Sequence, residues 1–272
     1  MPDATVGPRA FRVAYDGRPY YGFQRQPDVP TVEDTLFGAL SDLGVCKTAP
    51  SGYSAAGRTD AGASAIGQTV VLRAPDWLTP RAFNGELPET VKVWASADVE
   101  DDFHARHDAT TRIYAYHLHA PAATTDDAAV REAATQISGK HDFHNLTPDT
   151  DGSVRELSLT VERDGDFLVI EATAGGFPRH LVRRIAGLLS TVGDSQADLE
   201  WVDRVLGPTP IDGPEGVPMA QASGLLLRTV TYPTVTFAVD ERAAADARSV
   251  FASRRVVHAT RERVAGDIQK GI

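Results

Sequence analysis

Runs of strand length alternate with helical patterns along this chain, and the alternation occurs twice. With hairpins between some runs, this order predicts an α+β fold in layers. A polar segment at 101–106 separates the two rounds and predicts two domains, residues 1–106 and 107–272. The expected strands are 11–15, 69–72, 91–95, 112–119, 156–162, 167–173 and 224–232. The expected helices are 32–43, 80–87, 126–138, 179–192 and 198–206, followed by an exposed helical tail from residue 240.

The chain is strongly acidic, and nearly all of its basic residues are arginines. The net charge is −10, and only four of the 27 basic residues are lysines. Domains that bind nucleic acids tend to be basic, so the balance alone argues against such a partner. However, acid clusters such as 98–102 and 149–151 can cover the outside while arginines line a cleft. Strong acidity also favours a salt-adapted host, and activity without any gain in molar salt would contradict that hypothesis.

The sequence lacks the signals of several other protein classes. It has no apolar run long enough for a membrane span, and its first residues do not resemble a signal peptide. The single cysteine, Cys46, excludes an internal disulfide and a site with several cysteine ligands. The GxxxxGKS/T phosphate loop, the GxGxxG fingerprint and the HExxH zinc helix are all missing. We therefore expect a cytoplasmic protein that needs no nucleotide cofactor.

Two His-x-x-His pairs raise the alternative of a metal-dependent hydrolase. They are His104 with His107 and His141 with His144, each beside an aspartate. On a helix this spacing can bind a metal ion. Both pairs lie in loop-like segments, where most histidines bind nothing, so we expect no metal.

The residues 55–68 place one arginine and one carboxylate, Arg58 and Asp60, in a run of glycine, alanine and small polar residues. Glycine allows another molecule to approach the backbone closely. An apolar run follows at 69–72, and a loop that enters a strand can aim its side chains at a substrate. Taken alone, the pattern is better explained by a tight turn in which Asp60 binds its own backbone.

Two further segments could bind a phosphate-rich partner. Residues 20–26 interleave three aromatic rings with the side chains of Arg25 and Gln26, a mixture that can stack on bases and bind phosphates. The alternative is a surface loop with buried tyrosines. Arg179 and Arg183 are predicted to lie on the polar face of the helix 179–192, as either a solvated face or an anion-binding row.

Seven separate segments together resemble the tRNA pseudouridine synthase A family, in its order and at about its spacing, from residue 11 to about 233. They are Tyr15-Asp16-Gly17, Tyr21-Gly22-Phe23-Gln24-Arg25-Gln26, Ala56-Gly57-Arg58-Thr59-Asp60-Ala61-Gly62, Asp102-Phe103-His104-Ala105-Arg106, Arg112-Ile113-Tyr114-Ala115-Tyr116, Phe177-Pro178-Arg179-His180-Leu181-Val182-Arg183 and Ala222-Ser223-Gly224-Leu225. The resemblance implies two ferredoxin-like (RRM-like) halves with mainly antiparallel sheets, joined across a central catalytic cleft. It also implies a homodimer in which one tRNA touches both subunits.

The implied reaction converts uridine to pseudouridine at positions 38 to 40 of the tRNA anticodon stem-loop, without cofactor or metal. The resemblance makes Asp60 the catalytic carboxylate and Arg183 its partner. It assigns Tyr114 to packing on the target base and Arg58 to displacing the target nucleotide. Arg25, Gln26 and Arg179 are candidate RNA-binding residues.

These roles agree with elementary chemistry. Uracil must be detached at N1, turned and rejoined through C5, so the nucleotide has to leave its stack at a cost of a few kcal/mol. Asp60 can then attack C1′ or remove a proton from C2′, and the sequence leaves both routes open. A non-catalytic RNA-binding module of the same fold is the second hypothesis. The family motif usually continues with Val-His, where this chain has Ala63-Ser64.

Overall fold

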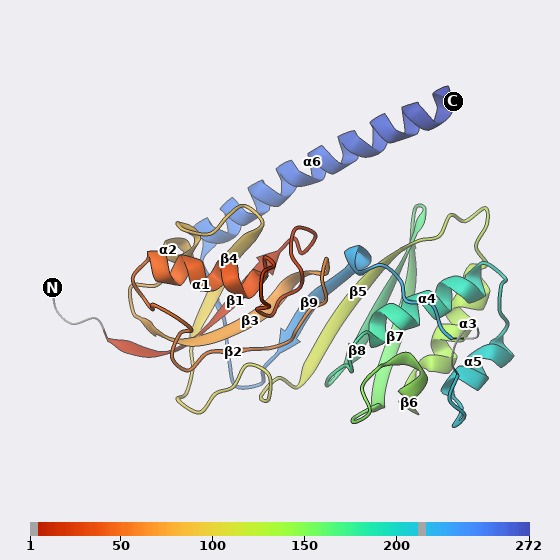
Figure 1. Ribbon diagram of the computed structural model, residues 1–272, viewed down its shortest axis with the longest axis horizontal. Coiled ribbons are helices and arrows are strands. Elements are labelled where there is room, and N and C mark those ends of the chain that lie inside the picture. Colours follow the sequence, from red (N-terminus) through yellow and green to blue (C-terminus); the bar gives the residue numbers. More distant parts are fainter. Residues whose placement is uncertain (1–4, 212–215) are drawn as a thin grey trace.

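A computed structural model describes residues 5–211 and 216–272 of the chain. Its strands form one continuous sheet along the long axis of the molecule (Figure 1). The strands are β1 (Val6–Tyr15), β2 (Ser54–Ala55), β3 (Ser64–Pro75), β4 (Val91–Asp98), β5 (Thr111–His119), β6 (Gly139–Asp142), β7 (Val154–Asp164), β8 (Phe167–Ala174), β9 (Leu225–Thr231) and β10 (Ala238–Val239). The helices are α1 (Val32–Asp42), α2 (Pro80–Asn84), α3 (Asp127–Ile137), α4 (Leu181–Gly193), α5 (Leu199–Leu206) and α6 (Glu241–Gly271), with 3₁₀ turns at His144–Leu146 and Ala222–Gly224.

The same order of elements builds both halves of the sheet, whose strands run in the order β10-β4-β1-β3-β9-β5-β8-β7-β6, with β2 on β3. In the first half β1, α1, β2, β3, α2 and β4 follow one another, and their strands lie as β4-β1-β3-β2. In the second half β5, α3, β7, β8, α4 and β9 give the equivalent order, β9-β5-β8-β7. The predicted mixed α+β fold with a mainly antiparallel sheet is confirmed.

The two halves meet where β3 and β9 pair in parallel. The pairing is short and joins Ser64 to Leu226 and Ala65 to Leu227. Beyond it the backbones stay close, because a Cβ atom on Gly67 would stand 2.6 Å from the carbonyl oxygen of Arg228. Arg12 of β1 bridges the junction by donating to the carbonyl oxygens of Gly67 and Val230. Side-chain bonds thus supplement a minimal strand ladder.

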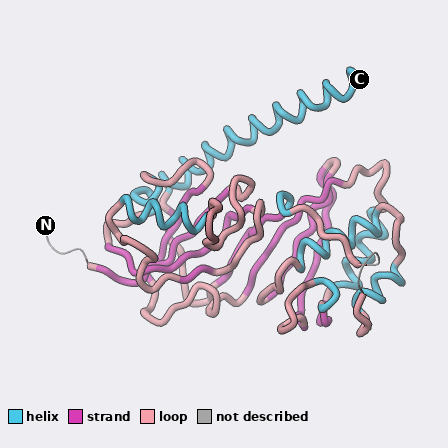
Figure 2. The backbone as a smooth tube through the Cα atoms, in the orientation of Figure 1, coloured by secondary structure: helices cyan, strands magenta, loops and turns pink. Residues whose placement is uncertain are grey.

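The strands occupy the middle of the molecule, and α3, α4 and α5 gather at the end that belongs to the second half (Figure 2). α1 covers the first half with a buried stripe that includes Leu36 and Leu40, as its helical spacing predicts. Thr31 caps this helix by accepting a hydrogen bond from the backbone of Asp34.

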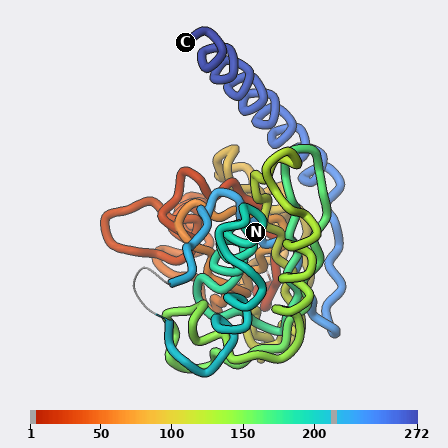
Figure 3. Tube along the Cα trace, turned by 90° about the vertical axis from the view of Figure 1, so that its right-hand side faces the viewer, coloured from red at the N-terminus to blue at the C-terminus, as the bar shows by residue number. Residues whose placement is uncertain are grey.

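The predicted helical tail is α6, and it returns to the first half of the sheet. Its first turns pack on β4 and α2 through Ala243, Ala244 and Ala247. The remainder leaves the body as a single straight arm (Figures 1 and 3). Within residues 5–211 and 216–272, no helix combines the length and the apolar character needed to cross a membrane.

Two predicted helix boundaries are wrong, for local reasons. The helix expected to run to Leu87 ends at Asn84, whose side chain turns to the backbone of Val93 and makes two hydrogen bonds with it. The helix expected to begin at Arg179 begins at Leu181, because His180 has a left-handed backbone with φ of +66°. Arg179 therefore lies outside the helix.

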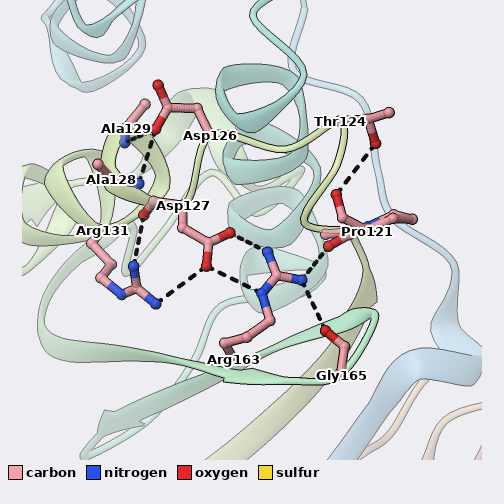
Figure 4. A network of polar contacts seen from close by, with 10 residues as sticks. Pro121, Thr124, Asp126, Asp127, Ala128, Ala129, Arg131, Arg163 and Gly165 are labelled. Atoms are coloured by element: carbon pink, nitrogen blue, oxygen red, sulfur yellow. Dashed lines mark hydrogen bonds and ion pairs between the residues drawn. The ribbon is translucent and has the colours of Figure 1, made fainter.

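An ionic network ties α3 to the β7–β8 hairpin (Figure 4). Asp126 caps α3 by accepting from the backbone amides of Ala128 and Ala129. Asp127 pairs with Arg163 of β7 and, at 3.4 Å, with Arg131 one turn along the helix. The hydrogen bond from Arg163 lowers the pKa of Asp127. The network fixes the start of α3 on the β7–β8 hairpin.

Candidate active site

Asp60 lies in the loop that connects β2 to β3, and the backbone of this loop is held from several sides. Phe23 donates to the carbonyl oxygen of Thr59 at 3.1 Å, and Gly62 donates to that of Tyr20 at the same distance. The side chain of Thr59 shares a hydrogen bond of 2.8 Å with the buried hydroxyl of Tyr15. These contacts fix the backbone on both sides of Asp60.

The carboxylate of Asp60 is bound by a residue of the second half. Arg183 of α4 donates from Nη1 to Oδ2 of Asp60 at 2.7 Å, and from Nε to the carbonyl oxygen of Ala220 at 2.8 Å. The Asp60 and Arg183 side chains are 21% and 12% exposed, so their attraction is less screened than in open water. The tight turn is present, since Ala63 donates to the carbonyl oxygen of Asp60 at 3.0 Å, but the carboxylate binds Arg183 rather than its own backbone.

His180 is a second neighbour of Asp60 that sequence reasoning missed. Its Nε2 lies 3.7 Å from Oδ1 of the carboxylate. The left-handed backbone at His180 accounts for its place outside α4. The available signal is a histidine that directly follows Arg179 and precedes Arg183 by three residues.

Tyr114 of β5 stands against the same loop. Its hydroxyl lies 3.6 Å from the place a Cβ atom would take on Gly57, and its ring packs edge-on against Phe177 at 5.2 Å. Burial raises the pKa of Tyr114 to about 12, and the charge of Asp60 acts in the same direction. The hydroxyl is therefore neutral at physiological pH, and it lies against the start of the loop that carries Asp60.

Two buried polar residues hold the start of the loop between β2 and β3, and neither was predicted. Arg112 of β5 donates to the carbonyl oxygens of Ala56, Arg106 and Gly175. Gln68 of β3 donates to the carbonyl oxygen of Gly57 at 2.9 Å. Polar side chains inside apolar strands were the signal, since a buried donor needs a partner.

The family motif usually has histidine at the position of Ser64. Here Ser64 binds the turn that follows β1. Its Oγ accepts a hydrogen bond of 3.0 Å from the backbone of Gly17. A Cβ atom on Gly17 would lie 1.8 Å from the carbonyl oxygen of Ala63, so only glycine fits. The turn after β1 and the catalytic loop are thus packed backbone to backbone.

Comparisons with known proteins fit this arrangement. A family model described as tRNA pseudouridine synthase matches residues 133–233. A tRNA pseudouridine synthase A from Haloarcula marismortui is 54% identical over 274 residues, which cover 97% of this chain and 100% of the relative. This chain belongs to the tRNA pseudouridine synthase A family. Its membership makes the chain an enzyme of the isomerase class.

Two further relatives carry the same description. A tRNA pseudouridine synthase A from Halobacterium salinarum is 53% identical over 261 residues, covering 96% of this chain and 98% of the relative. One from Methanosarcina mazei is 38% identical, covering 82% and 84%. Among solved structures, a chain of a Cbf5-Nop10-Gar1 complex is 14% identical with a TM-score of 0.38, covering 71% of this chain and 51% of that one.

The remaining candidates of this family member lie apart from the carboxylate. Arg58 is exposed, and within the described residues it makes no hydrogen bond or ion pair. Arg25 pairs with Asp34 at 2.6 Å, and Gln26 donates to the carbonyl oxygen of Tyr21. Tyr21 alone of the three aromatic rings in 20–26 is exposed, because Tyr20 and Phe23 are buried.

The predicted arginine row on one helix face is wrong. Arg183 points to Asp60, whereas Arg179 precedes α4 and binds Asp149 through its backbone amide and its guanidinium. The row breaks because the left-handed His180 turns the chain between the two arginines.

The histidine pairs of the metal alternative do not assemble a site within residues 5–211 and 216–272. In that part of the chain, no group of three or more His, Cys, Asp or Glu side chains is placed to hold a metal ion. His104 and His107 stack on each other with ring centroids 4.2 Å apart. His144 lies 3.5 Å from Asp142, and His141 faces the carbonyl oxygen of Ser138.

Alkaline solution is expected to destabilise this enzyme. Burial raises the pKa values of Tyr114 and Tyr232 to about 12, above that of an unfolded tyrosine at about 10. Their contribution is therefore complete below pH 10 and is lost as pH rises toward 12. Each tyrosine should remove about 1.4 kcal/mol of unfolding free energy per pH unit in that window.

Urea titrations at several pH values from about 9 to 11 would measure this slope. Tyr114→Phe should make the loss shallower, since one ionising group is gone. An equal slope in wild type and Tyr114→Phe would contradict the expectation.

Proposed function

We propose that this enzyme isomerises uridine to pseudouridine in tRNA, at positions 38, 39 or 40 of the anticodon stem-loop, with Asp60 as the catalytic carboxylate. The observation that carries the proposal is the site itself. One carboxylate, fixed by Arg183 from across the cleft, lies beside the flat ring of Tyr114 on a loop of small residues. A nucleotide that has left its stack needs such a space.

Each residue has a role in the proposed reaction. Asp60 opens the bond between C1′ and N1, either by attacking C1′ or by removing the proton from C2′. The ring of Tyr114 holds the detached uracil anion while it turns. C5 then bonds to C1′ as the bond from Asp60 to C1′ breaks or as the proton returns to C2′. The proton that C5 loses is balanced by the one that N1 gains, so no atom enters or leaves. Arg183 stabilises the negative charge of Asp60 at the start and end of the cycle. Arg58, which is exposed and unpaired among the described residues, enters the space that the flipped nucleotide leaves.

The finer architecture is part of the proposal. Each half follows a β-α-β-β-α-β order with its last strand beside its first, which supports two ferredoxin-like (RRM-like) units. We place the boundary after residue 106, so that the domains are 1–106 and 107–272, the second ending in a helical tail. The enzyme is a cytoplasmic homodimer in which one tRNA touches both subunits. Light scattering, which measures the mass of the enzyme in solution, tests whether it is a dimer. Arg25, Gln26 and Arg179 bind RNA outside the cleft.

One experiment tests the activity directly. Purified full-length protein is incubated with anticodon-arm RNA, and pseudouridine is then mapped by a chemical method that stops reverse transcription. We expect pseudouridine at one or more of positions 38 to 40 with no added cofactor, and an equal rate in EDTA. Tight binding without any product would support the RNA-binding module instead. Stoichiometric zinc or manganese in the purified protein, with no pseudouridine formed, would support the hydrolase class.

A further inference from the structure

The arm formed by α6 is the largest part of the molecule without a role in the proposed reaction. Only its first turns are buried, and from residue 252 onward nearly every residue is exposed or half-exposed. The arm leaves the body on the side where β1 ends, and it stands clear of the sheet in both views (Figures 1 and 3). An exposed helix of this length needs a partner or a strong local reason to persist.

The arm carries positive charge in a strongly negative protein. From Arg254 to Gly271 it has four arginines and one lysine against two carboxylates, whereas the whole chain has a net charge of −10. The earlier part of α6 balances Arg242 and Arg248 with Glu241 and Asp246. The excess is thus confined to the free part of the helix.

A buried carboxylate anchors the arm next to the catalytic loop. Asp16 is 6% exposed, and it accepts hydrogen bonds from Arg18 at 2.7 Å and from Arg254 of α6 at 2.5 Å. Burial opposes the charge of Asp16, but the bonds from these two arginines outweigh it and hold its pKa well below the usual range. Asp16 precedes Gly17, whose backbone packs on Ala63 of the catalytic loop.

Further cations gather around this anchor. Arg18 also donates to the ring of His258, at 2.6 Å from Nε2. Residues 254, 258 and 261 share one face of the helix, so Arg261 continues the line outward. We name Arg18, Arg254, His258 and Arg261 the arm cluster. Asp16 is the only carboxylate that this cluster contacts among the described residues, so the cluster has an uncompensated positive charge.

A groove opens beneath the arm beside the cluster. It has a volume of about 950 Å³ and lies between α6 and the strands β1, β3, β4 and β9. Trp94 and Phe251 line it, together with Arg248 and Arg255, which make no hydrogen bond or ion pair in the described part of the chain. Ser64 and Ser223 border the groove next to the catalytic loop. The groove therefore adjoins the start of β3, directly after the loop that carries Asp60, and it is bordered by the arm.

We propose that the arm cluster binds the phosphate backbone of the RNA substrate, on the side of the catalytic loop away from α4. The inference rests on the proposed function, since it takes RNA as the substrate. Phosphate contacts position a nucleic acid without reading its sequence, and arginine suits them through its fork of donors. The anchor at Asp16 then links the position of the RNA to the turn that supports Asp60.

A second copy of this chain fits the arm less well. An apolar stripe of Val250, Val257 and Val264 repeats every seven residues, as in a helix pair. The intervening layer of such a pair would be Ser253, Thr260 and Asp267, which do not form a dry seam. The arginines of the cluster flank the stripe and would repel those of a partner.

Two arginines on the arm provide a matched test. Arg261 belongs to the cluster, and Arg263 lies two residues further, about 200° around the helix. Binding of full-length Arg261→Gln and Arg263→Gln to anticodon-arm RNA is measured across a series of KCl concentrations. We expect Arg261→Gln to bind several-fold more weakly and its log–log salt slope to fall by about 1. Arg263→Gln should match wild type in affinity, in salt slope and in turnover.

Three results would overturn the inference. Equal affinity of Arg261→Gln and wild type would remove the cluster from the RNA interface. Equal losses in both variants would point to a general charge effect. A change in mass by light scattering in Arg261→Gln would identify the arm as an interface between copies. Wild-type protein that forms no pseudouridine would instead refute the proposed function. Pseudouridine formation is measured in a separate assay from RNA binding.

Discussion

Asp60→Asn is expected to abolish pseudouridine formation while leaving the fold and RNA binding almost intact. The amide keeps the shape of the side chain and an oxygen that can accept the hydrogen bond from Arg183. The contact between the two halves of the enzyme is therefore kept. It can neither attack C1′ nor remove a proton. Loss of a group that takes part in bond breaking typically costs 10⁴-fold or more, so we expect product to fall by about that factor. Single-turnover assays with RNA in saturating amounts measure it.

The matched control for this variant is Asp98→Asn. Asp98 also pairs with an arginine, Arg9, but it is 87% exposed and lies at the far end of β4. Its replacement should change neither rate nor melting temperature by much, because exposed ion pairs contribute little. An Asp60→Asn enzyme with near-normal activity would end the assignment of Asp60. A variant that fails to bind RNA would instead give Asp60 a structural role.

Gly17→Ala is expected to cause a comparable loss of activity by a different route. The added methyl group would stand 1.8 Å from the carbonyl oxygen of Ala63 and 2.4 Å from its carbonyl carbon. Backbone atoms on both sides cannot yield without moving the loop. Displacing a catalytic group by about 1 Å can cost 10²-fold, and we expect at least that here. The hydrogen bond from Gly17 to Ser64 should break as well.

Gly7→Ala separates this steric effect from the general cost of replacing a glycine in β1. A Cβ atom on Gly7 would meet nothing within 4 Å, so stability and rate should remain close to wild type. Circular dichroism and melting curves for both variants show whether Gly17→Ala still folds. If Gly17→Ala folds and turns over like wild type, the contact between the β1 turn and the catalytic loop does not position Asp60.

Local patterns predicted the helices and strands of this fold better than they predicted which of these elements pack or pair with one another. The caps, turn residues and apolar stripes of α1, α3 and the β7–β8 hairpin are carried by neighbouring residues and were visible in the sequence. The parallel contact of β3 with β9 was not visible, because its two residue pairs lie about 160 positions apart along the chain. The direction of α6 also had no local signal, since it is set by packing of its first turns on β4 and α2 and by the bond from Arg254 to Asp16.

The candidate site shows the same division. Asp60 and Arg58 stood out by composition alone, but a tight turn was then the better interpretation. The resemblance supplied Tyr114 and Arg183; the structure joins Arg183 to Asp60 and places Tyr114 against Gly57 of the same loop. His180 and Arg112 were missed because their roles depend on a left-handed backbone and on distant carbonyl groups. Neither a left-handed residue nor a contact with a distant carbonyl group produces a periodic pattern in the sequence.

The bond between Asp60 and Arg183 also has a consequence for biosynthesis. The two residues are 123 positions apart, and the strand β9 that joins the halves comes later still. At about 5 to 20 residues per second, a ribosome needs roughly 6 to 25 s to pass from one residue to the other. During that interval the nascent chain displays its carboxylate without the arginine that orients it. Half an enzyme of this design is therefore inert, and catalysis can begin only when both halves have been made.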